Sequence, residues 1–139
     1  MRIYIFGILV AFLGLLVVGQ VRADERCGLK SDKVFSVGAW RALPGDDGRV
    51  VYKALLFSND EKAIAEAGGT VEFYSGSIKI TSIPLTLDKP VAAKSHYELS
   101  FVEPADSPDG LIGDNDPIIT ALACVDHIGY ADGSGVIFN

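Results

Sequence analysis

The chain has 139 residues, of which 49% are hydrophobic, and a formal net charge of −6. This length favours one domain and excludes a multidomain assembly, and the composition excludes collagen-like, low-complexity and disordered proteins. Its two cysteines exclude a disulfide-dense miniprotein and a zinc site built from cysteines alone. The sequence therefore indicates a location and a fold class, but it does not specify a biochemical activity.

The first 23 residues have the features of a secretory signal peptide. Met1 and Arg2 form a short basic start, residues 3–19 are an apolar run within an uncharged stretch that extends to residue 21, and Val21-Arg22-Ala23 favours cleavage after Ala23. The alternative is an uncleaved membrane anchor, because residues 3–21 are just long enough to cross a bilayer. In either case residues 24–139 are predicted to form a single domain outside the cytoplasm, periplasmic or secreted.

The exported domain is predicted to be more acidic than the whole chain. Loss of Arg2 and Arg22 with the signal peptide leaves ten basic and 18 acidic residues, a net charge of −8. An acidic domain repels nucleic acid and anionic membrane surfaces. We therefore expect no nucleic-acid partner, and membrane contact only through residues 3–21 if the signal is retained. An acidic surface also favours solubility, so the net charge is equally expected of a soluble secreted protein.

Both cysteines lie in the exported part, Cys27 near its start and Cys124 near its end. An oxidising compartment makes a disulfide between them the default expectation, which would pin the N-terminal segment to a C-terminal strand. Two buried or free thiols are the alternative. Thr120, Leu122 and Cys124 share one face of a predicted strand, which we interpret as the core face.

Apolar and polar residues alternate along most of residues 24–139, as in β-strands. Val50–Phe57 is apolar enough for a central strand covered on both faces. Glu61–Ala67 fits either a short helix or, as we prefer, an irregular strand with a bulge at Gly68-Gly69 that continues to Tyr74. Asp132-Gly133 predicts a type I′ hairpin. The predicted strands are residues 34–41, 50–57, 61–74, 83–87 (an edge strand, because of Pro84), 97–101, 118–130 and 136–138.

About seven strands separated by turn residues predict an all-β fold, an antiparallel immunoglobulin-like β-sandwich. The inner faces are expected to hold Val71 and Phe73, with Tyr97, Leu99 and Phe101 from the strand that alternates most regularly. The aromatic side chains could form a ligand stripe but are better explained as core, because two inner faces need large residues. These are Trp40, Tyr52, Phe57, Phe73, Tyr74, Tyr97 and Phe101.

Several short motifs resemble a known family. The apolar strand from Val50, the Asn59-Asp60 break and Gly69-Thr70-Val71-Glu72-Phe73-Tyr74 resemble the FxLYD-type domain of bacterial exported proteins, an immunoglobulin-like sandwich. Tyr97–Phe101 also suits that family, and residues 123–134 are similar to the end of small periplasmic proteins. Val71 stands where the family prefers Phe, and Ser75 where it prefers Asp. The resemblance implies an extracytoplasmic accessory or binding module and supplies no catalytic residues.

The sequence contains few candidates for catalysis. Only His96 and His127 could act as a histidine base, and there is no Gly-x-Ser-x-Gly elbow and no phosphate-binding loop. Asp126 and His127 are neighbours, so on a strand we expect them to point to opposite faces and not to pair. A small enzyme, or a transition-metal site, would require His96 and His127 to lie close together.

One acidic loop is a weak candidate for Ca²⁺. Asp106, Asp109, Asp114 and Asp116 fall with Asn115 between Glu103 and Asp116, but their order differs from an EF-hand. The same residues are ordinary turn formers, so a solvated loop without metal is the preferred interpretation.

The leading hypothesis is an exported, non-catalytic immunoglobulin-like accessory or protein-binding module of the bacterial envelope that needs no cofactor. It would contact another envelope or extracellular protein, through edge-strand pairing for example. The alternative is an extracytoplasmic small-molecule or Ca²⁺-binding protein that uses the loop 103–116.

Overall fold

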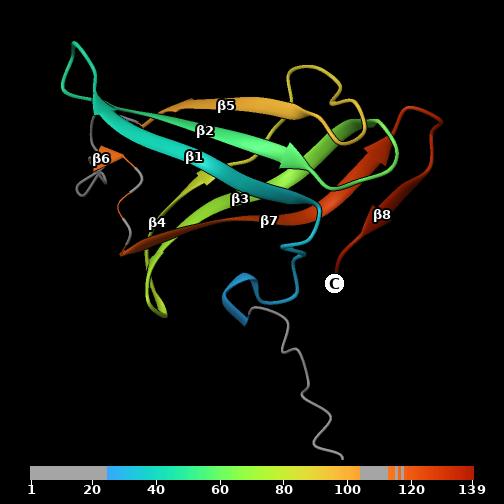
Figure 1. Ribbon diagram of the computed structural model, residues 1–139, viewed down its shortest axis with the longest axis horizontal. Coiled ribbons are helices and arrows are strands. Elements are labelled where there is room, and N and C mark those ends of the chain that lie inside the picture. The colour runs from blue at the N-terminus through green and yellow to red at the C-terminus, as the bar shows by residue number, and fades with distance from the viewer. Residues whose placement is uncertain (1–24, 104–112, 115, 117) are drawn as a thin grey trace, which may run out of the picture.

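The computed structural model describes residues 25–103, 113–114, 116 and 118–139 and shows an all-β protein of two antiparallel sheets (Figure 1). The first sheet has the strand order β5-β2-β1-β6 and the second has β4-β3-β7-β8. A 3₁₀ turn, η1 (Glu25–Cys27), precedes the strands, and no α-helix occurs among the described residues. The strands are β1 (Phe35–Pro44), β2 (Val50–Ser58), β3 (Ile64–Ser75), β4 (Ile78–Pro84), β5 (His96–Val102), β6 (Gly113–Asp114), β7 (Ile119–Tyr130) and β8 (Gly135–Ile137).

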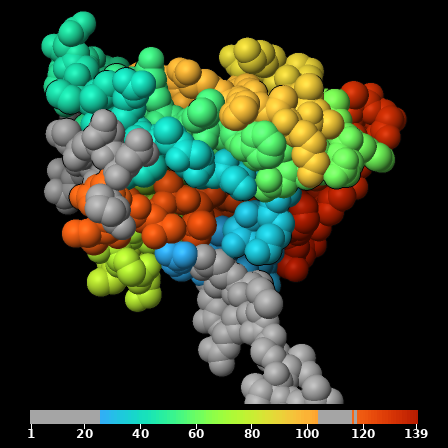
Figure 2. Space-filling model, in the orientation of Figure 1, coloured from blue at the N-terminus to red at the C-terminus, as the bar shows by residue number. Residues whose placement is uncertain are grey.

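The two sheets enclose the core, and alternation determines which side chains fill it. Val71 and Phe73 of β3 are fully buried, as predicted, and Tyr97 and Leu99 of β5 are buried beside them. The Trp40 ring meets the Phe73 ring edge to face, with centroids 5.2 Å apart. In the space-filling view of Figure 2 the two layers lie directly against each other. The predicted alternation is therefore confirmed for these residues. Two aromatic residues predicted as core, Phe57 and Tyr74, lie outside the core between the sheets. Phe57 packs against exposed His96, and Tyr74 contacts Arg26 of the N-terminal segment.

The first sheet leaves its outer face uncovered, contrary to one expectation. β2 is central in its sheet, as predicted, but Lys53 and Leu55 on its outer side are exposed. Their inward neighbours Tyr52, Ala54 and Leu56 are buried. The prediction that Val50–Phe57 is covered on both faces is therefore wrong within the described residues. The run is apolar because apolar residues also occupy outward positions.

The second sheet has a bulge at the predicted glycines, with Asp126 of β7 as the extra residue. β3 is continuous through Gly68 and Gly69, and its pairing with β7 shifts register between them. Gly69 has a φ of +140°, and a Cβ there would lie 2.1 Å from the carbonyl oxygen of Cys124. A side chain at position 69 is therefore incompatible with this close approach of the two strands.

The last hairpin forms with a different turn from the predicted one. The N–H of Gly133 donates to the carbonyl of Tyr130, and the N–H of Tyr130 donates to the carbonyl of Ser134. Gly133 has a φ of +87°, but Asp132 is not among the residues with positive φ. This is the three-residue loop with a bulge glycine and not the type I′ turn, which needs positive φ at both central residues.

The strand that contains Pro84 lies at an edge, as predicted, but the predicted bounds 83–87 are wrong. β4 spans Ile78–Pro84, and residues 85–87 follow it outside the strand. No helix of the described residues is long and apolar enough to span a bilayer. Residues 1–23, for which a signal peptide is predicted, lie outside the described residues.

Candidate functional site

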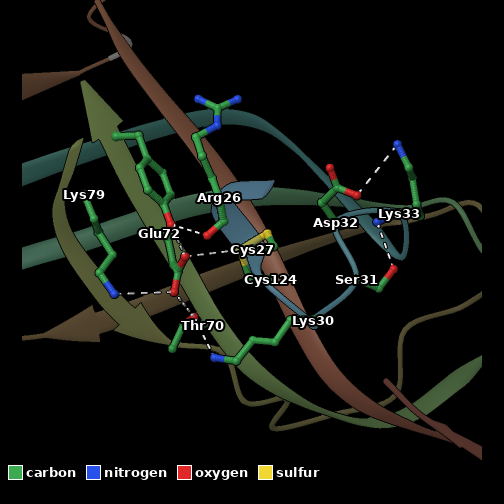
Figure 3. Close-up of a disulfide and its surroundings, with 11 residues drawn as sticks. Arg26, Cys27, Lys30, Ser31, Asp32, Lys33, Thr70, Glu72, Lys79 and Cys124 are labelled. Carbon is green, nitrogen blue, oxygen red and sulfur yellow. Dashed lines mark hydrogen bonds and ion pairs between the residues drawn. A yellow bond between two sulfur atoms is a disulfide. The ribbon is translucent and has the colours of Figure 1, made fainter. Parts of the chain in front are cut away.

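The N-terminal segment, residues 25–33, is fastened across the outer face of the second sheet (Figure 3). Cys27 and Cys124 form the predicted disulfide, with their Cα atoms 5.3 Å apart. Ser31 and Val125 exchange two backbone hydrogen bonds of 2.8 Å, so the segment also pairs with β7. The disulfide thus joins the two ends of the described domain, 97 residues apart in sequence.

This segment explains why Cys124 is buried although it does not face the core. Ala123 and Val125 are the β7 residues that join the core between the sheets. Thr120 and Leu122, by contrast, are exposed and half-buried, respectively, and share the outer face with Cys124. The expectation that Cys124 occupies a core face is therefore wrong, because its burial comes from the disulfide-linked N-terminal segment.

A buried carboxylate lies beneath the same segment. Glu72 of β3 is only 7% exposed. It accepts hydrogen bonds from the hydroxyls of Tyr74, at 2.5 Å, and Thr70, at 3.1 Å. The Lys79 ammonium lies 3.8 Å away, and a Glu72 oxygen lies 3.4 Å from the Cys124 sulfur. Because this sulfur is in a disulfide and has no proton, we regard the last distance as a contact without a hydrogen bond.

Tyr74 connects this carboxylate to the N-terminal segment. Its hydroxyl lies 2.6 Å from the carbonyl oxygen of Arg26, and the Arg26 guanidinium lies 5.4 Å from its ring centroid. Every buried side-chain N or O atom among the described residues has a hydrogen-bond partner. The polar groups around Glu72 are thus all hydrogen-bonded beneath the N-terminal segment, and their role is structural.

The two histidines occupy different sheets. His96 is exposed on β5 and packs edge to face against Phe57, with ring centroids 5.2 Å apart. His127 lies on β7 and lines a hollow of about 550 Å³ with Glu66 and Ile137, and His96 takes no part in it. No group of three His, Cys, Asp or Glu side chains suited to a metal occurs among the described residues.

His127 does pair with its neighbour, contrary to expectation. The Nδ1 atom of His127 lies 2.5 Å from a carboxylate oxygen of Asp126. Asp126 is the extra residue of a bulge in β7, because Gly68 pairs with His127 and Gly69 with Val125. The ring of His127 passes over Gly68, where a Cβ would come within 2.1 Å of it. The expected separation of the two side chains holds for a regular strand, and β7 is irregular at this point.

The side chains of the predicted Ca²⁺ candidates lie mostly outside the part of the chain that the structure describes. Asp106 and Asp109 lie outside the described residues, and Asp114 belongs to β6. A carboxylate oxygen of Asp116 accepts the N–H of Ile118 at 3.0 Å, which is ordinary turn chemistry. The acidic loop therefore stays a prediction from sequence.

Two tyrosine–aspartate hydrogen bonds tie loops to the strands. The Tyr130 hydroxyl donates to Asp60 at 2.6 Å, and this bond together with burial raises the pKa of Tyr130 to about 12. Burial opposes ionisation of Asp60, but hydrogen bonds from Tyr130 and from two backbone N–H groups outweigh it and lower the pKa of that carboxyl. Burial and a 2.6 Å hydrogen bond to Asp88 likewise raise the pKa of Tyr97.

Two further surfaces are defined by the structure. The first is the free edge of β4, where Ile78 and Ile80 are exposed. The second is the outer face of the first sheet, where a hollow of about 450 Å³ lies over β1, β2 and β5. Alternation along each strand indicates which residues face outward, but only the register reveals which of them are neighbours.

No family model, no curated protein and no solved structure matches this chain.

Proposed function

We propose that this chain is an exported, non-catalytic immunoglobulin-like module of the FxLYD type that binds a partner protein by strand addition. The partner would contribute an extended segment that pairs with the free edge of β4. The paired antiparallel sheets support an immunoglobulin-like sandwich, and the Cys27–Cys124 disulfide is compatible with an oxidising compartment such as the periplasm.

The observation that carries this proposal is the open hydrogen-bonding edge of β4. Among the described residues, β4 ends its sheet and pairs only with β3, in a ladder whose register shifts at Ile80. The N–H of Leu85 donates to Gly69 on β3, and alternate residues of an antiparallel strand direct their N–H and C=O groups to opposite sides. The N–H and C=O groups of Ser82 therefore point away from β3, toward the free edge.

The side chains of β4 also favour a partner. Ile78 is 72% exposed and Ile80 is 39% exposed. Exposed β-branched residues on an edge strand favour pairing with another strand, because they pack against cross-strand neighbours. We therefore expect the partner segment to be extended, with apolar residues opposite the two isoleucines.

The other edges of the sandwich are less suitable. β6 and β8 have two and three residues, against seven in β4. β5 is as long as β4, but it presents the polar side chains His96, Glu98 and Ser100 on its exposed face. Length and exposed apolar side chains therefore favour β4.

Photo-crosslinking in cells that export the full chain tests this proposal. A photoreactive side chain in place of Ile80 is expected to give a discrete adduct with another protein. The adduct should disappear when Ser82→Pro is added, because proline removes the N–H that the partner needs.

Ser100→Pro is the matched control. The N–H of Glu103 donates to Val50 on β2, so by the same alternation Ser100 directs its N–H toward the free edge of β5. This variant should keep the adduct, and circular dichroism should show that both proline variants are folded. Absence of an adduct, or an adduct that survives Ser82→Pro, would overturn strand addition at β4.

A further inference from the structure

The outer face of the first sheet brings two positive charges together. Arg41 of β1 and Lys53 of β2 are direct cross-strand partners, and both side chains are exposed on this face. Like charges in directly opposite positions destabilise a sheet. The pair occurs in a chain with an excess of acidic residues, whose overall field repels anions. On its other side Arg41 pairs with Asp114 of β6, so the same cross-strand row also holds an acidic residue.

The two cations are only weakly compensated. Within the part of the chain that the structure describes, Arg41 has no ion pair or hydrogen bond from its side chain, although its backbone pairs with Asp114 on β6. Lys53 has one ionic neighbour there, Glu98 of β5, with a nitrogen–oxygen distance of 3.9 Å between two exposed side chains. An exposed pair at this distance contributes little. Among the side chains that the structure describes, none neutralises the Arg41 guanidinium; Asp114 is described for its backbone alone.

Apolar residues border the charged row on both sides. The register places Leu43 of β1, Val51 of β2 and Val102 of β5 in one cross-strand row. It places Ala39 and Leu55 in the row on the other side, next to Glu98. Leu43 and Val102 are 42% and 50% exposed. A molecule on this face would thus meet aliphatic surface directly beside two positive charges.

The face is also hollow at this point. Residues from three strands surround a depression of about 450 Å³ that opens to solvent; they are Ala39, Trp40, Arg41, Lys53, Ala54, Leu55 and Glu98. Small Ala39, next to a register shift between Val37 and Ala39, leaves room beside the long Arg41 and Lys53 side chains. This volume is in the range that small-molecule sites occupy, about 300–1,000 Å³.

We infer that this hollow is a binding site for a small amphiphilic carboxylate. Arg41 would hold the carboxylate through two parallel N–H bonds, as its planar guanidinium allows. Lys53 would supply the second charge, and Leu55 would contact the aliphatic or aromatic body. Glu98 disfavours a ligand with further negative charges, so one carboxylate on an apolar body fits best. The site lies on the sheet opposite to β4, so it stands or falls independently of strand addition.

The test is a titration of the purified protein with hexanoate, followed by amide NMR. Saturable shifts are expected at residues 39, 41, 53 and 55. Arg41→Gln should weaken binding by about tenfold or more, whereas Glu98→Gln should strengthen it by removing a negative charge. Arg49→Gln is the control, because Arg49 is an exposed arginine in the β1–β2 turn that pairs with Asp47. It should leave the affinity unchanged.

Other results would overturn the inference. Absence of saturable shifts, or equal affinity in Arg41→Gln and the parent protein, would exclude this site. Equal binding of sulfate and hexanoate would contradict the role of Leu55, and binding only to anionic phospholipid vesicles would assign the face to a membrane surface. The melting temperature of Arg41→Gln should equal or exceed that of the parent protein, because a like-charge pair is removed. A lower one, with unchanged hexanoate affinity, would give Arg41 a structural role.

Discussion

The hydroxyl of Tyr130, in the last residue of β7, donates a 2.6 Å hydrogen bond to the carboxylate of Asp60 in the loop after β2. The Lys62 ammonium also lies over the Tyr130 ring, 5.0 Å from its centroid. This contact joins the connection between the two sheets to the far end of the second sheet. The Tyr130–Asp60 contact holds one end of the sandwich together, and the disulfide holds the N-terminal segment on the outer face.

Replacement of Tyr130 by phenylalanine should remove this bond and keep the ring. We expect Tyr130→Phe to lower the free energy of unfolding by about 1 kcal/mol at neutral pH, a value reduced by the partial exposure of the pair. Urea denaturation measures the effect. Tyr4 lies in the predicted signal, so Tyr4→Phe is not a useful control. Lys89→Gln changes an exposed loop residue and should leave the free energy of unfolding unchanged. No loss in Tyr130→Phe would show that the bond is not stabilising.

The same bond predicts how stability changes at high pH. The pKa of Tyr130 is raised from 10.0 to about 12 in the folded protein. Its contribution is therefore fully present below pH 10 and is lost as the pH rises through about 12. Stability measured across this interval should fall more steeply in the parent protein than in Tyr130→Phe. Identical profiles would contradict the raised pKa.

The opposite sign applies to Asp60, whose pKa is lowered below 3.8 in the folded protein. Its contribution is present above the unfolded-state pKa and is lost as the pH falls through the folded-state value. Asp60→Asn should accordingly flatten the acid limb of the stability profile below pH 3.8, which acid titration of the unfolding free energy would detect. An unchanged acid limb would contradict this assignment.

Loss of the disulfide should release the N-terminal segment. The double variant Cys27→Ser with Cys124→Ser is expected to lose about 4–5 kcal/mol, because the closed loop spans nearly the whole domain. Amide exchange at Ser31 and Val125 should accelerate most, since these residues fasten the segment to β7. Unchanged stability and exchange would mean that Ser31, Val125 and the Glu72 cluster hold the segment without the bond.

Gly69 and Gly48 both have positive φ and offer a matched comparison. Gly69→Ala should cost about 2–4 kcal/mol, because its Cβ would collide with the Cys124 carbonyl. Gly48→Ala should cost only about 1 kcal/mol, because the space around Gly48 is open and only its φ of +79° is strained. Equal losses in thermal or urea unfolding would contradict the steric account of the bulge.

Local pattern predicts much of this fold. Tyr97 and Leu99 are buried because they alternate with polar residues, and Gly68-Gly69 marks the bulge because no other residue tolerates that approach. Pairing between distant residues has no such local signal. The Arg41–Lys53 pair depends on the register of β1 and β2, and the burial of Glu72 depends on a covering segment more than 40 residues earlier in the chain. Asp126 and His127 departed from expectation because Asp126 is the extra residue of a bulge in β7, which interrupts alternation there.

Residue-resolved hydrogen exchange of the crosslinked complex shows whether β4 accepts another strand along its free edge. In the free protein the amide of Ser82 should exchange rapidly while that of Ile83, directed toward β3, is protected. In the complex Ser82 should become protected, and Ser100 at the opposite edge should remain unchanged. Rapid exchange at Ser82 in the complex, with protection at another surface, would contradict the claim.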